Sequence, residues 1–161
     1  MIGFLTRLFA PGEPTLSEAT ARDAAAFAPL HAAAFRRGWS EDEVERLLLD
    51  QRVIAHRATH GRELVGFILS RMAADEAGIL SVAVAARRRG RGIARALLDL
   101  HLRRLAGLGV RAVFLEVEES NQPARRLYHR AGFREVGRRP GYYPQGGGPA
   151  LAALVLRRDL A

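Results

Sequence analysis

The sequence predicts a single domain of the α/β class, in the broad sense that includes α+β folds, with a mixed sheet and flanking helices. Its 161 residues suit one domain of ordinary size, and a hydrophobic fraction of 48% is enough for a buried core. Expected strands and helices follow one another in mixed order, with two crossover helices between strands. No repeat or linker divides the chain. We therefore expect one domain over residues 14–161, preceded by an N-terminal arm over residues 1–13 that ends at Pro11-Gly-Glu-Pro14.

The first third of the domain predicts a short strand and two helices. The strand covers residues 15–19, and the first helix runs from Thr20 to about Ala34. Pro29 inside this helix predicts a kink or a boundary. Thr20-Ala-Arg-Asp23 resembles a capping box, and Ser40-Glu-Asp-Glu43 is a cleaner one that opens the second helix.

The middle of the chain predicts a hairpin followed by a strand, a turn and a helix. Residues 52–59 and 64–72 have the composition of two strands around the turn at 60–63. Another strand covers residues 78–84. The helix after it lasts about four turns, until Gly107-Leu-Gly109 ends it, because glycine tolerates the left-handed conformation of a helix C-cap.

The last third predicts three more strands and one helix. Residues 110–117 include a nearly continuous apolar run, as expected for a buried strand beside a parallel neighbour. Asn121 can cap a helix that extends to Ala131. Gly132-Phe133 then turns into a strand, and residues 151–156 form the last strand.

The segment from Val82 to Leu98 is the most informative part of the chain. A short alternating apolar run ends at Val84, a turn rich in arginine and glycine follows, and a helical apolar pattern begins at Ile93. Such a turn leaves backbone N–H groups at the start of a helix, where they can bind an anion. Glycines let a phosphate approach the backbone closely, and arginines add charge-assisted donors. The pattern favours a phosphate site, although a plain tight turn gives the same pattern.

The composition excludes several classes of site. Cysteine is absent, so disulfides, thiolate nucleophiles and zinc–thiolate sites are excluded. No apolar run approaches the roughly 20 residues that a transmembrane helix needs. The first residues do not form a convincing signal peptide, so we expect a cytoplasmic protein without membrane contact.

All 25 basic side chains are arginines, and the net charge is +8. Three interpretations stay open: replacement of lysine by arginine in a GC-rich genome, a local basic site for phosphates, and nucleic-acid binding. Aromatic residues make up only 7% of the chain and do not alternate with the arginines, as stacking on single strands would require. We therefore expect no stable nucleic-acid binding.

Glu116 and Tyr128 are the candidate catalytic residues. Glu116 comes at the end of a predicted strand, and parallel strands place their carboxyl ends on the ligand side. It should therefore share a rim with the glycine turn, unless it is a solvated surface carboxylate. Tyr128 lies on the helix after Asn121, where its ring could instead pack in the core while its hydroxyl finds a partner.

The histidines are poorer candidates. His56 and His60 lie on a predicted strand and its turn rather than on one helix face. His31, His101 and His129 are expected to lie apart, so we expect no metal site. No serine has a partnered His and Asp at recognisable positions, which leaves a serine hydrolase weakly supported.

Two groups of residues, taken together, resemble the GNAT acetyltransferases. The segment Arg89–Ala94 is similar to the Q/R-x-x-G-x-G/A coenzyme A pyrophosphate loop of that family, and the register Arg87–Gly92 also fits the pattern. Further matches follow at the family's spacing: Asn121, Ala124, Leu127-Tyr128 and Ala131-Gly-Phe133. The resemblance implies the GNAT fold, a mostly antiparallel central sheet with one splayed parallel strand pair.

The resemblance extends from about Thr15 to Leu160 and is greatest to the ribosomal-protein alanine N-acetyltransferases. The segments that carry it are Gly38-Trp-Ser40, Val82-Ala-Val84, the glycine loop, Leu115-Glu-Val117, Ser120-Asn121, Leu127-Tyr128 and Arg138–Pro144. It implies acetyl-CoA as co-substrate, the N-terminal alanine of a small-subunit ribosomal protein as acceptor, Glu116 as general base and Tyr128 as general acid. The acetyl-CoA contacts that it implies are Val82, Ala83, Val84, Arg89, Gly90, Arg91, Gly92, Ile93, Ala94, Arg95 and Asn121.

One segment departs from the family pattern. Residues 146–153 lack the acidic pair that the family often carries before its last strand, so the resemblance says less about the acceptor than about the cofactor half. Two other functions stay open: acetylation of a small-molecule amine, and a non-catalytic module that binds RNA or the ribosome through its arginines.

Overall fold

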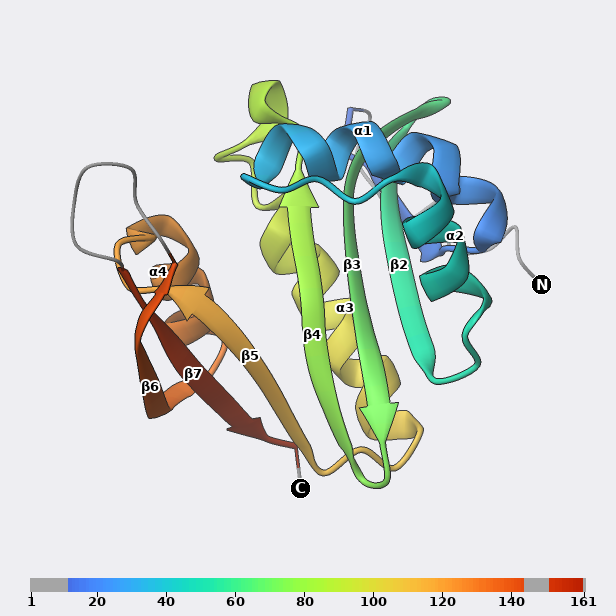
Figure 1. Cartoon of the computed structure of the whole chain (residues 1–161). Helices are drawn as coiled ribbons and strands as arrows, with labels where there is room; N and C mark the ends of the chain where they lie inside the picture. Colours follow the sequence, from blue (N-terminus) through green and yellow to red (C-terminus); the bar gives the residue numbers. More distant parts are fainter. Residues whose placement is uncertain (1–11, 144–150, 161) are drawn as a thin grey trace.

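A computed structural model describes residues 12–143 and 151–160 of the chain, so most of the expected N-terminal arm lies outside the described residues (Figure 1). The helices are α1 (Ala24–Ala34), α2 (Glu41–Leu49), α3 (Ile93–Gly107) and α4 (Gln122–Arg130), with 3₁₀ turns at Ala21–Asp23 and Ala86–Arg88. The strands are β1 (Thr15–Glu18), β2 (Val53–His60), β3 (Glu63–Ala73), β4 (Glu76–Val84), β5 (Ala112–Glu118), β6 (Arg134–Tyr143) and β7 (Leu151–Asp159). Among the described residues, no helix is long and apolar enough to cross a membrane.

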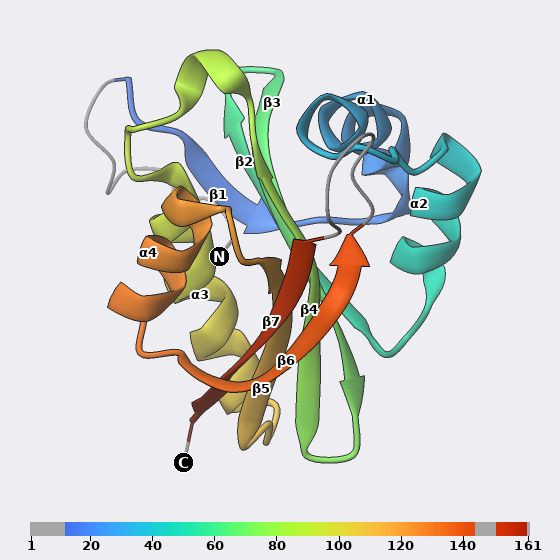
Figure 2. The same cartoon turned by 60° about the vertical axis from the view of Figure 1, so that its left-hand side comes forward.

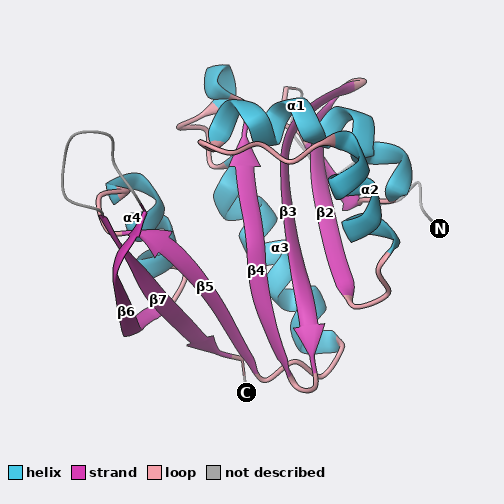
Figure 3. Cartoon of the chain, in the orientation of Figure 1, coloured by secondary structure: helices cyan, strands magenta, loops and turns pink. Residues whose placement is uncertain are grey.

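The strands form one sheet in the order β1-β2-β3-β4-β5-β7-β6 (Figure 3). The β4–β5 pair is parallel, and the other pairs of neighbours in this order are antiparallel. The parallel pair arises because the chain crosses from β4 to β5 through α3, whereas hairpins join β2 to β3 and β3 to β4. The mixed, mostly antiparallel sheet is therefore confirmed.

The parallel pair separates soon after it begins. β4 and β5 are paired at only three positions, and the last of these is Gly78 opposite Phe114. Beyond that point the two strands diverge toward their carboxyl ends, which Figure 1 shows as a V between them. We call this opening the β4–β5 gap. It is the splayed strand pair that the sequence led us to expect.

Helices cover both faces of the sheet (Figure 2). On one face, α3 and α4 enclose a core that includes Ile68, Leu98 and Val113. On the other face, α1 and α2 pack on a second core built around Phe27 and Phe67, whose stacked rings lie 4.4 Å apart. The two layers leave the carboxyl ends of β4 and β5 between them, and the site is built there.

The expected helix starts are confirmed, with one difference in the first helix. Ser40 and Glu43 form a complete capping box at α2. Thr20 and Asp23 form another, but it opens a 3₁₀ turn that leads into α1. The expectation that Pro29 could mark a boundary is wrong, since α1 continues through it. A proline inside a helix removes one hydrogen bond, and burial of Phe27 and His31 on the same helix compensates for that loss.

Candidate active site

Backbone donors line the β4 side of the β4–β5 gap. The N–H of Ala85 donates to the carbonyl of Val65 in β3 at 2.9 Å. Because backbone groups alternate along a strand, Ala83 also faces β3, while the N–H and C=O groups of Val82 and Val84 face the gap. β5 has diverged at this level and does not pair with them. These backbone groups can therefore bind an extended, amide-containing ligand in the manner of an added strand.

The glycine turn has a backbone that suits an anion. Gly90 and Gly92 adopt φ values of +76° and +78°, which side-chain-bearing residues rarely adopt. Gly92 is the N-cap of α3 and provides no side-chain cap, and the first turn of α3 holds no acidic residue. The first N–H groups of the helix, from Ile93, Ala94 and Arg95, thus lack the usual capping partner and can bind phosphate oxygens.

The arginines around this turn differ in their partners. Arg87 and Arg88 form ion pairs with Glu63 of the β2–β3 hairpin. Arg89 folds back, so that its Nε donates to the carbonyl of Val84 at 3.4 Å. The expected site residues from Val82 to Arg95 are thus brought together at the open end of the β4–β5 gap.

A small cavity adjoins Arg91. It measures about 180 Å³, and Gly92, Ile93 and Leu16 also line it. Arg95 points along α3 and pairs with Asp99 at 3.0 Å. Arg91 therefore lines a hollow beside the start of α3, together with Glu13.

Glu116 lies on the other side of the β4–β5 gap, near the end of β5. Its neighbours Leu115 and Val117 belong to the core under α3 and α4, so strand alternation turns Glu116 to the opposite face. Its carboxylate is partly exposed and pairs with the guanidinium of Arg139 from β6, at 3.1 Å. The carboxylate thus faces the same side as α1 and α2, and it is held by a guanidinium from β6, which is separated from β5 by β7.

Further ion pairs surround Glu116. Glu118 accepts from Arg36 at 3.3 Å, which connects the end of β5 to the chain after α1. Glu119 pairs with Arg138 at 2.8 Å. Carboxylates at the end of β5 therefore lie next to arginines that come from the segments on either side. The arrangement can exchange one cation for another, such as the amine of a substrate.

Tyr128 lies on the face opposite Glu116. It is 8% exposed and belongs to the same core as Leu115 and Val117, with its ring edge-on to Phe133 at 5.6 Å. Burial raises the pKa of Tyr128 to about 12. The phenol is therefore protonated at neutral pH. The structure therefore places Glu116 and Tyr128 on opposite faces of β5.

Asn121 has a structural role in addition to the one that the resemblance implies. Its side-chain oxygen accepts a hydrogen bond of 3.2 Å from the N–H of Ala124 and so caps α4. The cap fixes the start of the helix that carries Tyr128, while the amide nitrogen of Asn121 stays able to donate to a ligand.

One expectation about the histidines is wrong. His101 does not lie apart, because α3 presses it against β2 and β3, where its Nδ1 is 2.8 Å from Nδ1 of His56 and its Nε2 is 2.6 Å from Oγ of Ser70. All three side chains are buried, and burial lowers the pKa of His101 to about 3. The sequence separates His56 from His101 by 45 residues, so no local pattern could reveal this contact.

Among the described residues, no group of three or more histidine or acidic side chains is placed to hold a metal ion. The groups that the described residues bring to the site are backbone donors, arginines and carboxylates.

Comparisons with known proteins agree with this geometry. The model of the acetyltransferase (GNAT) family matches residues 24–133, which include α3, β5 and α4. The [ribosomal protein bS18]-alanine N-acetyltransferase of Haemophilus influenzae is 33% identical over 106 residues, which cover 66% of this chain and 72% of that protein. Its counterpart in Escherichia coli K12 is 31% identical over 105 residues, 65% of this chain and 71% of that protein.

Solved structures share the fold. The ribosomal-protein-S18-alanine N-acetyltransferase from Escherichia coli superimposes with a TM-score of 0.85 at 28% identity and covers 92% of this chain and 94% of its own. Arabidopsis thaliana NAA60 in complex with acetyl-CoA gives a TM-score of 0.79 at 22% identity, over 91% of this chain and 98% of its own, and shows likeness of fold alone. The family match and the relatives together show that this chain is an N-acetyltransferase that belongs to the GNAT family.

Proposed function

We propose that the protein transfers the acetyl group of acetyl-CoA to the N-terminal amine of a protein, and that the acceptor is the N-terminal alanine of a small-subunit ribosomal protein. The observation that carries the proposal is the β4–β5 gap. On its β4 side, backbone groups at the start of α3 can bind phosphate and those of β4 can bind an amide, and on its β5 side lies a carboxylate. The relatives named for bS18 acetylation support this choice of acceptor.

The β4 side of the gap fits acetyl-CoA. The uncapped start of α3 and the two positive-φ glycines suit the pyrophosphate, and Arg91 beside them supplies positive charge. The backbone groups of Val82 and the N–H of Val84, which face the gap, suit the amide-containing arm, whose thioester then lies in the gap. A backbone N–H there can polarise the thioester carbonyl, and Asn121 can donate from the start of α4.

Glu116 is the base in this proposal. An N-terminal amine has a pKa of about 7.7–8.0, so an appreciable fraction is already neutral near pH 7.5. Glu116, directly or through one water, removes the remaining proton as the nitrogen attacks the carbonyl carbon. Before this step the substrate's ammonium group takes the place of Arg139 on the carboxylate, so charge at Glu116 stays balanced while the acceptor binds.

Tyr128 acts from the other face on the departing sulfur. The new C–N bond forms as the C–S bond breaks, and the sulfur gains negative charge. An alkyl thiol has a pKa of about 8.5, well below that of the buried phenol. Tyr128 therefore acts as a proton donor only within a hydrogen bond, which stabilises the negative charge that develops on the sulfur, and the thiolate takes its proton from solvent as coenzyme A leaves. The proposed roles need no covalent intermediate on the protein.

Acetylation assays on defined acceptors test the proposal. We expect acetyl transfer to a peptide that begins with alanine, a lower rate when only that first residue is changed, and little transfer to polyamines or other small amines. Transfer to small amines alone would assign the site to small-molecule acetylation. Salt-dependent RNA binding without any turnover would favour a non-catalytic module.

A further inference from the structure

A bulge in β4 presents an apolar side chain next to the proposed base. Leu69 pairs with Ser81 and Ser70 pairs with Ile79, so Leu80 is the extra residue of a β-bulge. Ile79 points into the core under α3. Leu80 points to the face of α1 and α2, where its side chain is 37% exposed.

Leu80 and Glu116 lie near the same level on the two sides of the gap, with Leu80 offset by the bulge. The last paired residues of β4 and β5 are Gly78 and Phe114, and Leu80 and Glu116 each lie two residues farther along. Neighbouring strands are about 4.8 Å apart where they pair, and an extended peptide advances about 3.3 Å per residue. A peptide whose N-terminal amine lies at Glu116 therefore reaches Leu80 within its first few residues.

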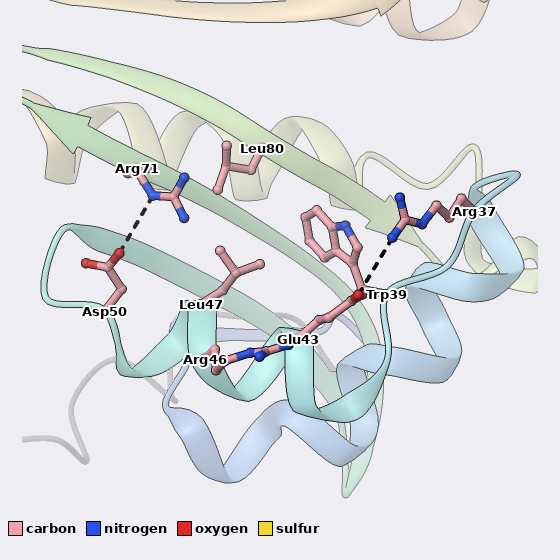
Figure 4. Close-up of a pocket in the computed structure, with 8 residues that line it drawn as sticks. All are labelled: Arg37, Trp39, Glu43, Arg46, Leu47, Asp50, Arg71 and Leu80. Atoms are coloured by element: carbon pink, nitrogen blue, oxygen red, sulfur yellow. Dashed lines mark ion pairs between the residues drawn. The ribbon is translucent and has the colours of Figure 1, made fainter.

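A cavity opens directly beside Leu80 (Figure 4). It measures about 520 Å³, and contributions come from the α1–α2 connection, α2, β3 and β4. The residues that line it are Arg37, Trp39, Glu43, Arg46, Leu47, Asp50, Arg71 and Leu80. Figure 4 shows the side chains of Trp39, Leu47 and Leu80 converging between the strands and α2, with charged groups around them. We call this cavity the Trp39 pocket.

The side chain of Trp39 is fixed by contacts with His31 of α1. Its ring stacks on His31 at 4.0 Å, and the backbone N–H of Trp39 donates to Nδ1 of His31 at 3.0 Å. Burial lowers the pKa of His31, which keeps this nitrogen an acceptor at neutral pH. The preceding residue must be Gly38, because a Cβ there would lie 2.6 Å from Cβ of Ala32. The pocket therefore has a rigid aromatic wall that needs no rearrangement to bind a ligand.

The carboxylates of the pocket already have partners. Glu43 accepts from the N–H of Ser40 at 3.0 Å and pairs with Arg37 at 3.8 Å. Asp50 pairs with Arg52 at 3.0 Å and with Arg71 at 3.7 Å. A ligand in the pocket can therefore contact its apolar side chains, Trp39, Leu47 and Leu80, and the flat faces of its guanidinium groups. Arginine stacks on aromatic rings, and an aromatic ring buries well against leucine and tryptophan.

We propose that the Trp39 pocket binds an aromatic side chain of the acceptor, carried by one of the residues directly after the acceptor's N-terminal residue. This inference rests on the proposed function, because that function places the acceptor's amine at Glu116. It deepens the proposal by giving the enzyme a second point of recognition, so the first residue alone does not determine which proteins are acetylated.

Peptides that share an N-terminal alanine and carry one phenylalanine at the second, third or fourth position test the inference. The control peptides replace that phenylalanine by alanine or by glutamate. We expect phenylalanine at one of these positions to raise kcat/KM about tenfold, mainly through a lower KM, which is the scale of one aromatic contact. Leu80→Ala should reduce this ratio toward one. Leu49→Ala, at an exposed leucine of α2 outside the pocket, should leave the ratio unchanged.

Trp39 is the only tryptophan of the chain, so its fluorescence reports on the pocket without turnover. With coenzyme A present, the phenylalanine peptide should change this emission at lower concentrations than the alanine peptide. Equal kcat/KM for all peptides, a preference for glutamate, or a phenylalanine preference without any fluorescence change would each overturn the inference. Ring-dependent binding without acetylation would overturn the proposed function and leave the pocket as a binding site.

Discussion

Acid should destabilise this protein through His101. Burial, and to a smaller extent the charge of His56, lower the pKa of His101 from 6.5 to about 3. The unfolded chain therefore binds a proton at this residue below pH 6.5, while the folded chain does not until about pH 3. The stability that the neutral His101 side chain contributes is thus fully present above pH 6.5 and is lost as the pH falls from 6.5 to about 3. Between pH 7 and pH 4.5 the loss from His101 is about 2.5 kcal/mol, at 1.36 kcal/mol per pH unit.

Urea unfolding at pH 7 and pH 4.5, followed by far-UV circular dichroism, measures this loss. His101→Gln removes the titrating group. It should lower stability at pH 7, because His56 and Ser70 each lose a buried partner. The further fall on going to pH 4.5 should then be smaller than in the wild type by about 2.5 kcal/mol. His129→Gln, at an exposed position on α4, should behave like the wild type. An equal fall in His101→Gln and wild type would refute the reasoning.

Two substitutions test the cofactor half of the site. Gly92→Asp puts a side chain at a φ of +78° and a negative charge at the start of α3, so it should weaken acetyl-CoA binding at least tenfold, as measured by calorimetry. The control Gly109→Asp, with a φ of +88° just after the other end of the same helix, should bind acetyl-CoA normally. Unchanged affinity in a folded Gly92→Asp protein would rule out the loop as the binding site. Tyr128→Phe removes only the hydroxyl and keeps the buried ring, so kcat should fall about 10²-fold while KM and the melting temperature change little. If kcat is unaltered under conditions where chemistry is rate-limiting, Tyr128 is a packing residue only.

Local patterns in the sequence predicted much of the fold. The strand–glycine–helix order around Gly92, the capping box at Ser40 and the strand composition of β2 and β3 each depend on a few residues, so each can be recognised without the rest of the chain. The sheet and its splayed parallel pair are confirmed.

Features that depend on distant contacts could not be predicted. The ion pair between Glu116 and Arg139 depends on how β5, β7 and β6 pair. The contact of His56 with His101 forms only when α3 packs on β2. The bulge at Leu80 is a property of register between two strands, and a proline such as Pro29 is tolerated because packing outweighs one lost hydrogen bond. Hydrophobic periodicity contains none of this information.

The roles of Glu116 and Tyr128 stay predictions, as does that of every residue assigned to acetyl-CoA. The structure places the carboxylate of Glu116 on one face of β5 and the phenol of Tyr128 in the core on the other face. The Trp39 pocket went unnoticed in the sequence because its eight lining residues come from four separate segments. Only the triplet Gly38-Trp-Ser40 gave a signal, and that signal was a resemblance rather than a physical argument.

The central claim is that Glu116 removes the proton from the acceptor amine, and the pH dependence of Glu116→Gln tests it most directly. The measurement is kcat/KM on a peptide with an N-terminal alanine between about pH 6 and 9, because this range brackets the pKa of the amine. We expect the substitution to lower the rate by about 10²–10⁴-fold near pH 7, and the deficit to shrink at higher pH as the amine loses its proton unaided. Glu118→Gln and Glu119→Gln, at the neighbouring carboxylates, are the matched controls and should lose far less. Equal activity of Glu116→Gln and wild type across this range would contradict the mechanism and leave Glu116 as the ion-pair partner of Arg139.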